Sequence, residues 1–534
     1  MADTDTDLIS ALLEGTVEQL DLPDELVTRM HLIHADIGGY FAEHLPGDVD
    51  WNIYSQGSGR IGTGVPPEGT DEWDLDTVAE ADVDKDEITK PDLKDLVAAT
   101  LQAYVADRAD DEKLAPADVE SGRRCLTLLY AEPFHVDMLP AVRNPDGPKG
   151  GIWITDRDLV RWQPSNPRGY AEWFELQMER EFLMRRTALA KAASVSIDDI
   201  PSWRVKTTLQ RTVQVLKLHR NSFFAAEPGA RPPSCVVTTL AALAYRGEGS
   251  LADAVVAAAD AMPGYIDTGG AVWVVENPAQ PGDNLADRWS AQPGALGRFG
   301  PWLADLRSTL AAARSTNRGL PGVAAALSAR FDEALVTKSV QRFAERQTER
   351  RDAGAWWSPG AAPWLRPSVG RRSAATRSTV SRKGLQTMPL ERQAVLLKMR
   401  WAGTTTVARD LTWKGHLRPT AVSPTYSVEV RYQLRMRPRV AILDPPLDPG
   451  PGNRLPHIYA PDDLCLYTAG DWNATTALAE TIVPWTAEWL FHYEAWLVTG
   501  IWSGGGDALV PKPDPDADIG DIESVTQPRG RLRR

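Results

Sequence analysis

A glycine-serine turn that leads into a strand with two aspartates constrains this sequence more than any other feature. Gly57 and Ser58 come shortly before residues 71–76, which read Asp-Glu-Trp-Asp-Leu-Asp. Side chains alternate between the two faces of a strand, so Asp74 and Asp76 point the same way. The pattern predicts a mixed α/β fold in which two carboxylates lie one pleat apart, next to a turn.

A third acidic residue, Asp137, lies in a second strand-like run at residues 134–142. If this strand pairs beside the first, the three acids converge. Mg²⁺ prefers oxygen ligands and is commonly held by carboxylates together with substrate phosphates, and Mn²⁺ suits the same ligands. We therefore expect Asp74, Asp76 and Asp137 to be catalytic metal ligands for an in-line displacement at a phosphate. His135 is expected on the opposite face, as a packed or hydrogen-bonded histidine.

The turn itself has the composition of a phosphate site. Gly57 lets backbone N–H groups approach a triphosphate, and a helix that begins just after the turn favours anionic phosphates. Ser58 adds a hydroxyl donor, and Gln56 and Thr63 flank the turn as further substrate-binding candidates. An Asp-x-Asp pair alone is usually a solvated strand face, but this turn and the later Asp137 favour the catalytic interpretation.

The length, composition and net charge of the chain exclude several classes of protein. At 534 residues the chain is expected to hold two or three domains. A composition of 43% hydrophobic and 24% charged residues, without a leader pattern or an apolar run of about 20 residues, predicts a cytoplasmic protein that is not in a membrane. A formal net charge of -14 argues against general nucleic-acid binding, which requires a cationic surface.

Composition and periodicity divide the chain into five segments. Residues 1–165 predict an α/β catalytic core, and residues 166–350 predict a helical half. A basic stretch rich in Ser and Thr predicts a linker at 351–384, and a stretch rich in Asp, Pro and Gly predicts a disordered tail at 504–534. Between them, residues 385–503 are expected to form a separate α+β domain.

Three segments show clear periodicity. The first fifty residues read as helix, ending near Gly38 and Gly39. Tyr426–Met436 alternates strictly between apolar and polar residues, which predicts a half-buried antiparallel strand. Ile482–Val498 predicts an amphipathic helix whose aromatic stripe belongs to a core rather than to a ligand site.

Several motifs in order carry a family resemblance. Residues 57–78, the run Phe-His-Val-Asp-Met-Leu-Pro at 134–140, Ser-Asn-Pro-Arg-Gly-Tyr at 165–170 and Leu-Lys-Leu-His-Arg at 216–220 together resemble bacterial nucleotidyltransferases related to cyclic GMP-AMP synthase and oligoadenylate synthase. Further short matches, such as Glu-Asn-Pro at 276–278, extend the likeness through the predicted helical half.

This resemblance implies both a fold and an activity. The fold would be a polymerase-beta-like catalytic core with a helical half like that of oligoadenylate synthase. The activity would be synthesis of a cyclic di- or trinucleotide second messenger from nucleoside triphosphates in CBASS antiphage defence. The resemblance also implies that Lys217 and Ser234 contact phosphates. On its residue type alone, a helical lysine is as often a surface side chain, and that alternative remains open.

Residues 385–503 are similar to ubiquitin-conjugating enzymes, and more closely to the conjugating-enzyme-like proteins found near bacterial nucleotidyltransferases of this kind. Cys465 falls where the resemblance places the thioester-forming cysteine. The family's His-Pro-Asn triplet has no Asn here, and Pro456-His457-Ile458 stands near its place. A missing oxyanion donor lowers rates by about a hundredfold or more, so conjugation and a buried core thiol both stay open.

Further expectations concern the two other cysteines and the acceptor of the transferred nucleotide. Cys125 and Cys235 lie in apolar runs and are expected to be buried small hydrophobic residues. The nucleotide could instead be transferred to a protein or RNA acceptor, with the C-terminal domain a passive docking module. The expected partners are nucleoside triphosphates and a target protein or effector of the defence operon.

Overall fold

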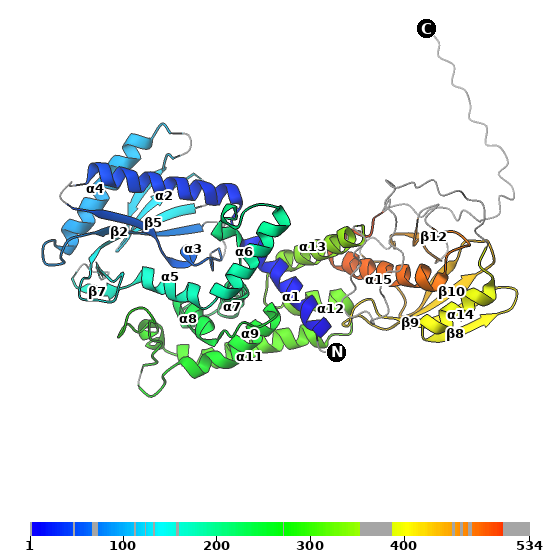
Figure 1. Cartoon of the computed structure of the whole chain (residues 1–534). Helices are drawn as coiled ribbons and strands as arrows, with labels where there is room; N and C mark the ends of the chain where they lie inside the picture. Colours follow the sequence, from blue (N-terminus) through cyan, green and yellow to red (C-terminus); the bar gives the residue numbers. More distant parts are fainter. Residues whose placement is uncertain are drawn as a thin grey trace, which may run out of the picture.

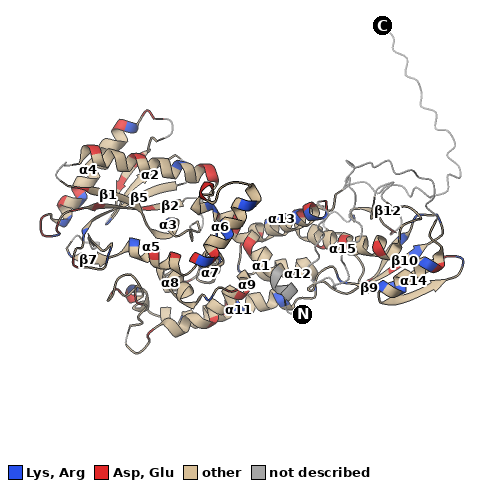
Figure 2. Ribbon diagram, in the orientation of Figure 1, with Lys and Arg blue, Asp and Glu red and all other residues tan. Residues whose placement is uncertain are grey.

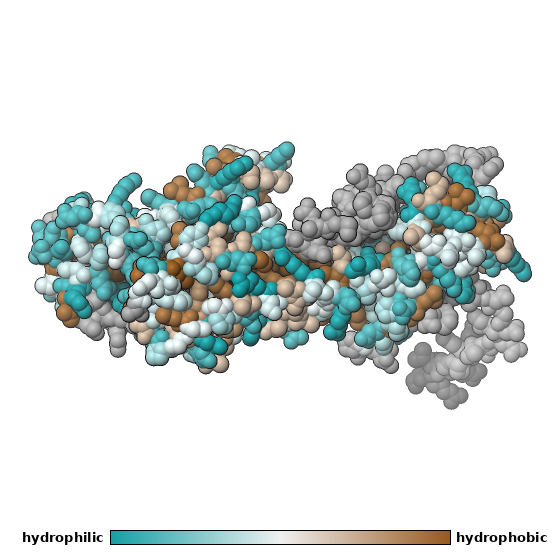
Figure 3. All heavy atoms as spheres, turned by 90° about the horizontal axis from the view of Figure 1, so that it is seen from below, coloured by the Kyte–Doolittle hydropathy of each residue, from teal (hydrophilic) through white to brown (hydrophobic). Residues whose placement is uncertain are grey.

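The structure is a computed structural model that describes residues 3–45, 49–66, 73–111, 114–122, 124–131, 134–155, 160–270, 272–352, 387–450, 454–459, 463–467 and 472–505. The molecule is elongated, with a large sheet at one end, a smaller sheet at the other and helices between them (Figure 1). Seen from below, its surface carries hydrophobic residues interrupted by hydrophilic ones (Figure 3). None of the described helices is long and apolar enough to cross a membrane.

The large sheet has seven strands. Their order is β1-β2-β5-β4-β3, and β6 pairs with β5 and then with β7. The β2–β5 pair is parallel, whereas the other pairs of this sheet are antiparallel. The strands are β1 (Trp51–Ser55), β2 (Trp73–Ala81), β3 (Asp118–Ser121), β4 (Leu126–Leu129), β5 (Phe134–Arg143), β6 (Ile152–Thr155) and β7 (Trp162–Ser165).

Two helices, α2 (Asp24–His44) and α4 (Lys90–Arg108), cover one face of this sheet (Figure 1). Leu75 and Val136 point from the strands into the core that these helices close. Because side chains alternate along a strand, the neighbouring acidic positions face away from that core. The prediction that a helix ends at the paired glycines was wrong, because α2 continues past them and buries Tyr40 and Phe41.

The helical half is built around one apolar cluster. Buried residues from nine of its described helices, including the first helix of the chain, belong to this cluster. The sequence division counts that first helix with the catalytic core, but its side chains pack in the helical half. The helices are α1 (Asp3–Val17), α5 (Pro167–Leu176), α6 (Glu179–Ala193), α7 (Thr208–Phe223), α8 (Ser234–Ala244), α9 (Leu251–Ala261), α10 (Asp287–Ser290), α11 (Ala295–Ser315), α12 (Gly319–Ser328) and α13 (Glu333–Asp352).

The C-terminal part is an α+β unit. Four antiparallel strands in the order β11-β10-β9-β8 pack against two helices, and β12 pairs with β13. Most of the predicted linker and all of the predicted tail beyond residue 505 lie outside the described residues. The elements are α14 (Leu390–Arg400), β8 (Gly403–Val407), β9 (Leu411–Leu417), β10 (Tyr426–Tyr432), β11 (Arg439–Asp444), β12 (Ile458–Tyr459), β13 (Asp463–Leu464) and α15 (Ile482–Thr499).

Strand β10 is shorter than its alternating pattern predicts. Val428, Val430 and Tyr432 are buried as expected, but Leu434 and Met436 are exposed. A turn begins after Tyr432, where the Met436 N–H donates to the carbonyl of residue 433. Alternation tells which face a residue takes, whereas this turn determines where the strand ends.

Helix α15 contacts both halves of the molecule. Its aromatic stripe lies in the core of the C-terminal unit, as predicted from the sequence. On the other side, Phe491 and Ala495 join the apolar cluster of the helical half. A buried ion pair of 2.7 Å joins Arg351 of α13 to Glu488 of α15. The C-terminal unit is therefore packed directly onto the helices α12 and α13 (Figure 1).

Candidate active site

The parallel pairing of β2 with β5 brings the predicted acids together. Asp76 is the register partner of Asp137, and Asp74 lies two residues before Asp76 on the same face. Burial, followed by the charges of Asp137 and Asp74, raises the pKa of Asp76 to about 6. The prediction that the strand of Asp137 pairs beside the first strand is confirmed.

His135 lies on the same face as the acids, so its expected position on the opposite face was wrong. Residues 135 and 137 are two apart on a strand, and such residues share a face. His135 Nε2 lies 3.1 Å from an oxygen of Asp74, and both side chains are accessible to solvent. Asp74 thus has a partner at the edge of the acidic cluster.

Asp137 is oriented from the neighbouring strand. Thr127 of β4 is its register partner on the other side, and the Thr127 hydroxyl donates to an Asp137 oxygen. One side of the carboxyl group is therefore held by a fixed donor, and the other side faces Asp76. Sequence reasoning missed Thr127, although its position in the strand beside Asp137 would have indicated it.

The glycine-serine turn lies directly over these acids. Gly57 begins the single helical turn α3 (Gly57–Arg60) with a φ of +67°, a conformation that favours glycine. A Cβ atom at this position would overlap with the carboxylate of Asp76. The Gln56 N–H donates to the Asp76 carbonyl, which fixes the turn to β2. Ser58 is half-buried beside it.

Helix α7 brings Lys217 to the same place. Its Nζ donates to the Thr63 carbonyl at 2.9 Å, and the Thr63 hydroxyl lies at 3.3 Å. Lys217 is only 2% exposed, so the alternative of a surface lysine is excluded. Burial lowers the pKa of Lys217 to about 7, while the charge of Asp76 acts in the opposite direction. Thr63 is fully buried, so its side chain faces Lys217 in this structure.

Ser234 is the first residue of α8 and is exposed. Its hydroxyl accepts a hydrogen bond of 3.1 Å from Arg220 of α7. The neighbouring Cys235 is also exposed, so the expectation that it is a buried residue was wrong. The start of α8 lies on the surface because the helix buries its later residues from Val236 onward.

The chemistry of the acidic cluster fits a divalent cation. Among the described residues, no three His, Cys, Asp or Glu side chains are arranged as a complete metal cage. Two carboxylates with substrate phosphates are, however, the usual ligand set for Mg²⁺. Burial, followed by the charges of Asp137 and Asp74, raises the pKa of Asp76, and a bound cation would offset both effects.

Cys465 directly follows β13, which pairs with β12 in the C-terminal unit. In the molecule β12 lies at the end opposite β2 and β5 (Figure 1). The thiol is partly exposed, and the pKa of the neighbouring Tyr459 is raised by burial and by this cysteine. Arg437 stacks on the Tyr459 ring at 4.2 Å and pairs with Asp463 at 2.7 Å. Because the thiol is not fully buried, a simple core cysteine does not describe this position. Cys125 is partly exposed as well, and burial raises its pKa to about 11.

The chain is similar to known proteins in two parts. Residues 393–509 match the family model of the type II CBASS E2 protein. The c-di-GMP synthase of Roseivirga ehrenbergii is 28% identical over 310 residues, which cover 58% of this chain and 79% of the relative. The cyclic dinucleotide synthase CdnG of Bradyrhizobium diazoefficiens is 29% identical over 337 residues, 58% of this chain and 77% of the relative.

The solved structures include one with a matching fold. The Bradyrhizobium diazoefficiens CD-NTase CdnG in complex with GTP superposes with a TM-score of 0.52 at 26% identity, over 63% of this chain and 99% of that structure. The acids on β2 and β5 and this fold are those of a nucleotidyltransferase. More narrowly, the matches support a CBASS CD-NTase that carries an E2-like domain.

Proposed function

We propose that this enzyme joins nucleoside triphosphates into a cyclic di- or trinucleotide in a reaction that requires Mg²⁺ or Mn²⁺. The pairing of Asp76 with Asp137 beneath the Gly57 turn is the observation that supports this proposal most strongly. The two similar synthases are named for cyclic dinucleotides, one of them c-di-GMP, and CdnG has been solved with GTP. GTP is therefore the first substrate to test.

Each residue of the site has a proposed role. Asp74, Asp76 and Asp137 would hold the cation, which supplies charge neutralisation at the reacting phosphate. The turn formed by Gly57 and Ser58 would bind the triphosphate through its N–H groups and the serine hydroxyl.

Residues around the turn would complete the substrate site. Gln56 joins β1 to the turn. Lys217 of α7 contacts Thr63, which follows the turn. Ser234 would reach phosphate from α8. Lys217 and Thr63 contact each other here, so a direct contact with substrate requires a rotation of these side chains.

The E2-like domain would modify the activity of the synthase or its attachment to another protein. Cys465 would form the thioester, with the Tyr459 hydroxyl as a neighbouring polar group. This proposal depends on the partial exposure of the thiol. A thioester adduct in cells that hydroxylamine releases, and that Cys465→Ala abolishes, is the expected result. Cells in which both forms carry the same adducts would exclude this role.

The synthase test uses labelled GTP and ATP with Mg²⁺. We expect a small, phosphatase-resistant product that Asp76→Asn and Asp137→Asn abolish. Asp82→Asn is the matched control, because Asp82 directly follows β2 but pairs with Arg143 at the opposite end of the strand. Label on a protein or RNA in place of a small product would show that the acceptor is a macromolecule and would refute the proposal.

A further inference from the structure

Four side chains of one segment hold the loop that follows the glycine-serine turn. Residues 61–64 present consecutive backbone carbonyl groups, and each accepts a hydrogen bond from a different side chain at or just before α7. We call these side chains the α7 row. They are Gln210 to Ile61 at 2.9 Å, Lys206 to Gly62 at 3.0 Å, Lys217 to Thr63 at 2.9 Å and Gln214 to Gly64 at 3.0 Å.

The spacing of the row follows from helix geometry. Positions 210, 214 and 217 are separated by four and three residues, so they lie on one face of α7. Lys206 directly precedes Thr207, the N-cap residue of this helix. Gln210 is 6% exposed and Gln214 is 1% exposed. Buried amides require partners, and both find them in loop 61–64.

The loop in turn holds the glycine-serine turn. The N–H groups of Ile61, Gly62 and Thr63 donate to the carbonyls of Gly57, Gly59 and Ser58. Residues 61–63 thus accept from the α7 row through their carbonyls and donate to the turn through their amides. The position of the turn over Asp76 is therefore set by α7 as well as by β2.

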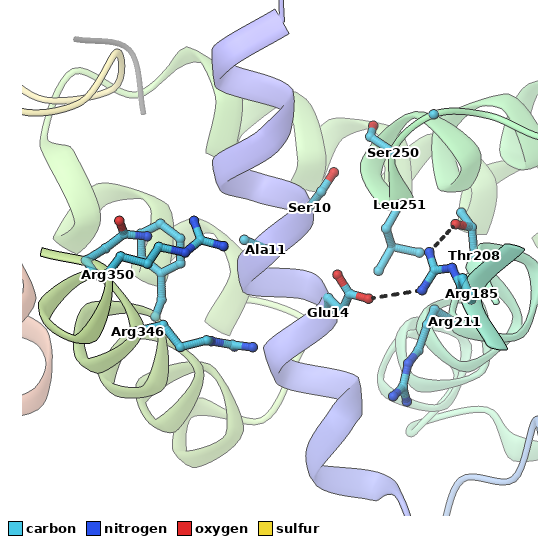
Figure 4. A pocket seen from close by; sticks show the side chains of 13 residues that line it. Ser10, Ala11, Glu14, Arg185, Thr208, Arg211, Ser250, Leu251, Arg346 and Arg350 are labelled. Carbon is cyan, nitrogen blue, oxygen red and sulfur yellow. Dashed lines mark hydrogen bonds and ion pairs between the residues drawn. The ribbon is translucent and has the colours of Figure 1, made fainter. Parts of the chain in front are cut away.

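Helix α7 is also anchored by Arg211, which donates to the oxygen of Gln214 at 3.0 Å. Arg211 donates to both carboxylate oxygens of Asp21, at 2.6 and 2.8 Å, just after α1. These contacts border a groove of about 340 Å³ above α1 (Figure 4). In that groove Arg185 donates to Thr208 and lies 3.7 Å from Glu14. Four arginines, Arg185, Arg211, Arg346 and Arg350, line this groove together with one acid, Glu14. Both basic and acidic residues lie on the helices of this half (Figure 2).

We propose that Gln210 and Gln214 are positioning residues for nucleotidyl transfer. They contact no reacting atom themselves, but they fix loop 61–64 so that the turn meets the triphosphate in one geometry. This inference rests on the proposed function of the turn. It assigns the helical half a part in nucleotide affinity that the acids do not explain.

Two variants remove the donors with little other change. Gln214→Glu keeps the oxygen that accepts from Arg211 at 3.0 Å but has no N–H to give to Gly64. Gln210→Glu keeps the oxygen that accepts from the Thr207 N–H at 2.8 Å, so the start of α7 is retained while the donor to Ile61 is lost. The matched control is Gln341→Met, because that amide donates to Glu345 within α13 on the surface.

The experiment compares the KM and kcat for GTP with Mg²⁺, together with the thermal midpoint. Loss of one donor should raise the KM about tenfold with a smaller change in kcat, and the control should match the wild type. A purely structural role would lower the amount of active enzyme and the midpoint while leaving the KM unchanged, which would overturn the proposal.

Equilibrium binding of GTP separates this inference from the proposed function. Wild-type protein that binds GTP but forms no product would contradict the proposed synthesis. The row would still be supported if the two variants bound GTP more weakly than the wild type. If the variants bind GTP as tightly as the wild type and the control, the proposed positioning role of the α7 row is refuted, whatever product is made.

Discussion

Glu494 is a buried acid between the E2-like domain and the helical half, and its titration can be predicted. The side chain is 1% exposed. Its oxygens accept hydrogen bonds from the Ser423 hydroxyl at 2.9 Å, the Tyr426 hydroxyl at 3.1 Å and the Leu320 N–H at 3.1 Å. Burial raises the pKa of Glu494 from 4.5 to about 7, although these donors and the charge of Arg418 lower it in part.

The upward shift of the Glu494 pKa determines how the free energy of unfolding changes with pH. A carboxyl group whose pKa is raised by folding stabilises the folded protein fully at low pH, and this contribution disappears as the pH rises through the folded value. A shift from 4.5 to about 7 corresponds to ~3 kcal/mol. We therefore expect the free energy of unfolding of the C-terminal part to fall by about this amount between about pH 4.5 and pH 7.

Glu494→Gln tests the reasoning. An amide has nearly the same shape but does not titrate, so this part of the pH dependence should disappear. One of the three neighbouring donors would face the new NH₂ group, at a cost of about 1 to 3 kcal/mol that does not vary with pH. Urea unfolding followed by tryptophan fluorescence, at several values from pH 5 to pH 8, measures the difference. Parallel curves for the wild type and the variant would refute the argument.

Three further outcomes are expected. Gly57→Ala should abolish product formation, because its Cβ would overlap with Asp76, and should also lower the thermal midpoint, because alanine is strained at a φ of +67°; wild-type turnover in this variant would contradict the site geometry. Arg351→Met should lower the urea midpoint, because unpairing the buried Glu488 costs about 3 to 5 kcal/mol; an unchanged midpoint would mean that this pair contributes little. Chelation of divalent cations should stop turnover and added Mg²⁺ or Mn²⁺ should restore it, and product made in excess chelator would exclude a metal-dependent reaction.

The acidic face could be predicted because it depends on local rules. Alternation along a strand places Asp74 with Asp76, and one assumed strand pairing adds Asp137. The same rule, applied to residues 135 and 137, would also have placed His135 on this face. The error lay in counting the faces, and the sequence held the information.

The α7 row could not be predicted in this way. Gln210, Gln214 and Lys217 form a polar stripe on a helix, and such a stripe usually faces solvent. Their partners lie about 150 residues earlier in the chain, with Lys217 and Thr63 separated by 154 residues. Only the tertiary packing of the helical half against loop 61–64 shows that this stripe is buried.

Helix α15 shows the same limit of prediction from a single helix pattern. The aromatic stripe predicts one buried face, but Glu488, His492 and Glu494 are buried as well. Their partners come from α12, α13 and the segment before β10, which the pattern of α15 alone does not indicate. Polar residues on a helix are thus compatible with a second buried face where specific donors and cations meet them.

This second face connects the E2-like domain physically with the nucleotidyltransferase part. Apolar residues of α15 share one cluster with α13, and α13 packs along α1. The segment after α1 pairs with Arg211 of α7, and the neighbouring Gln210 holds the loop that follows the nucleotide turn. The helical half therefore forms one continuous series of packed contacts between the E2-like domain and the turn.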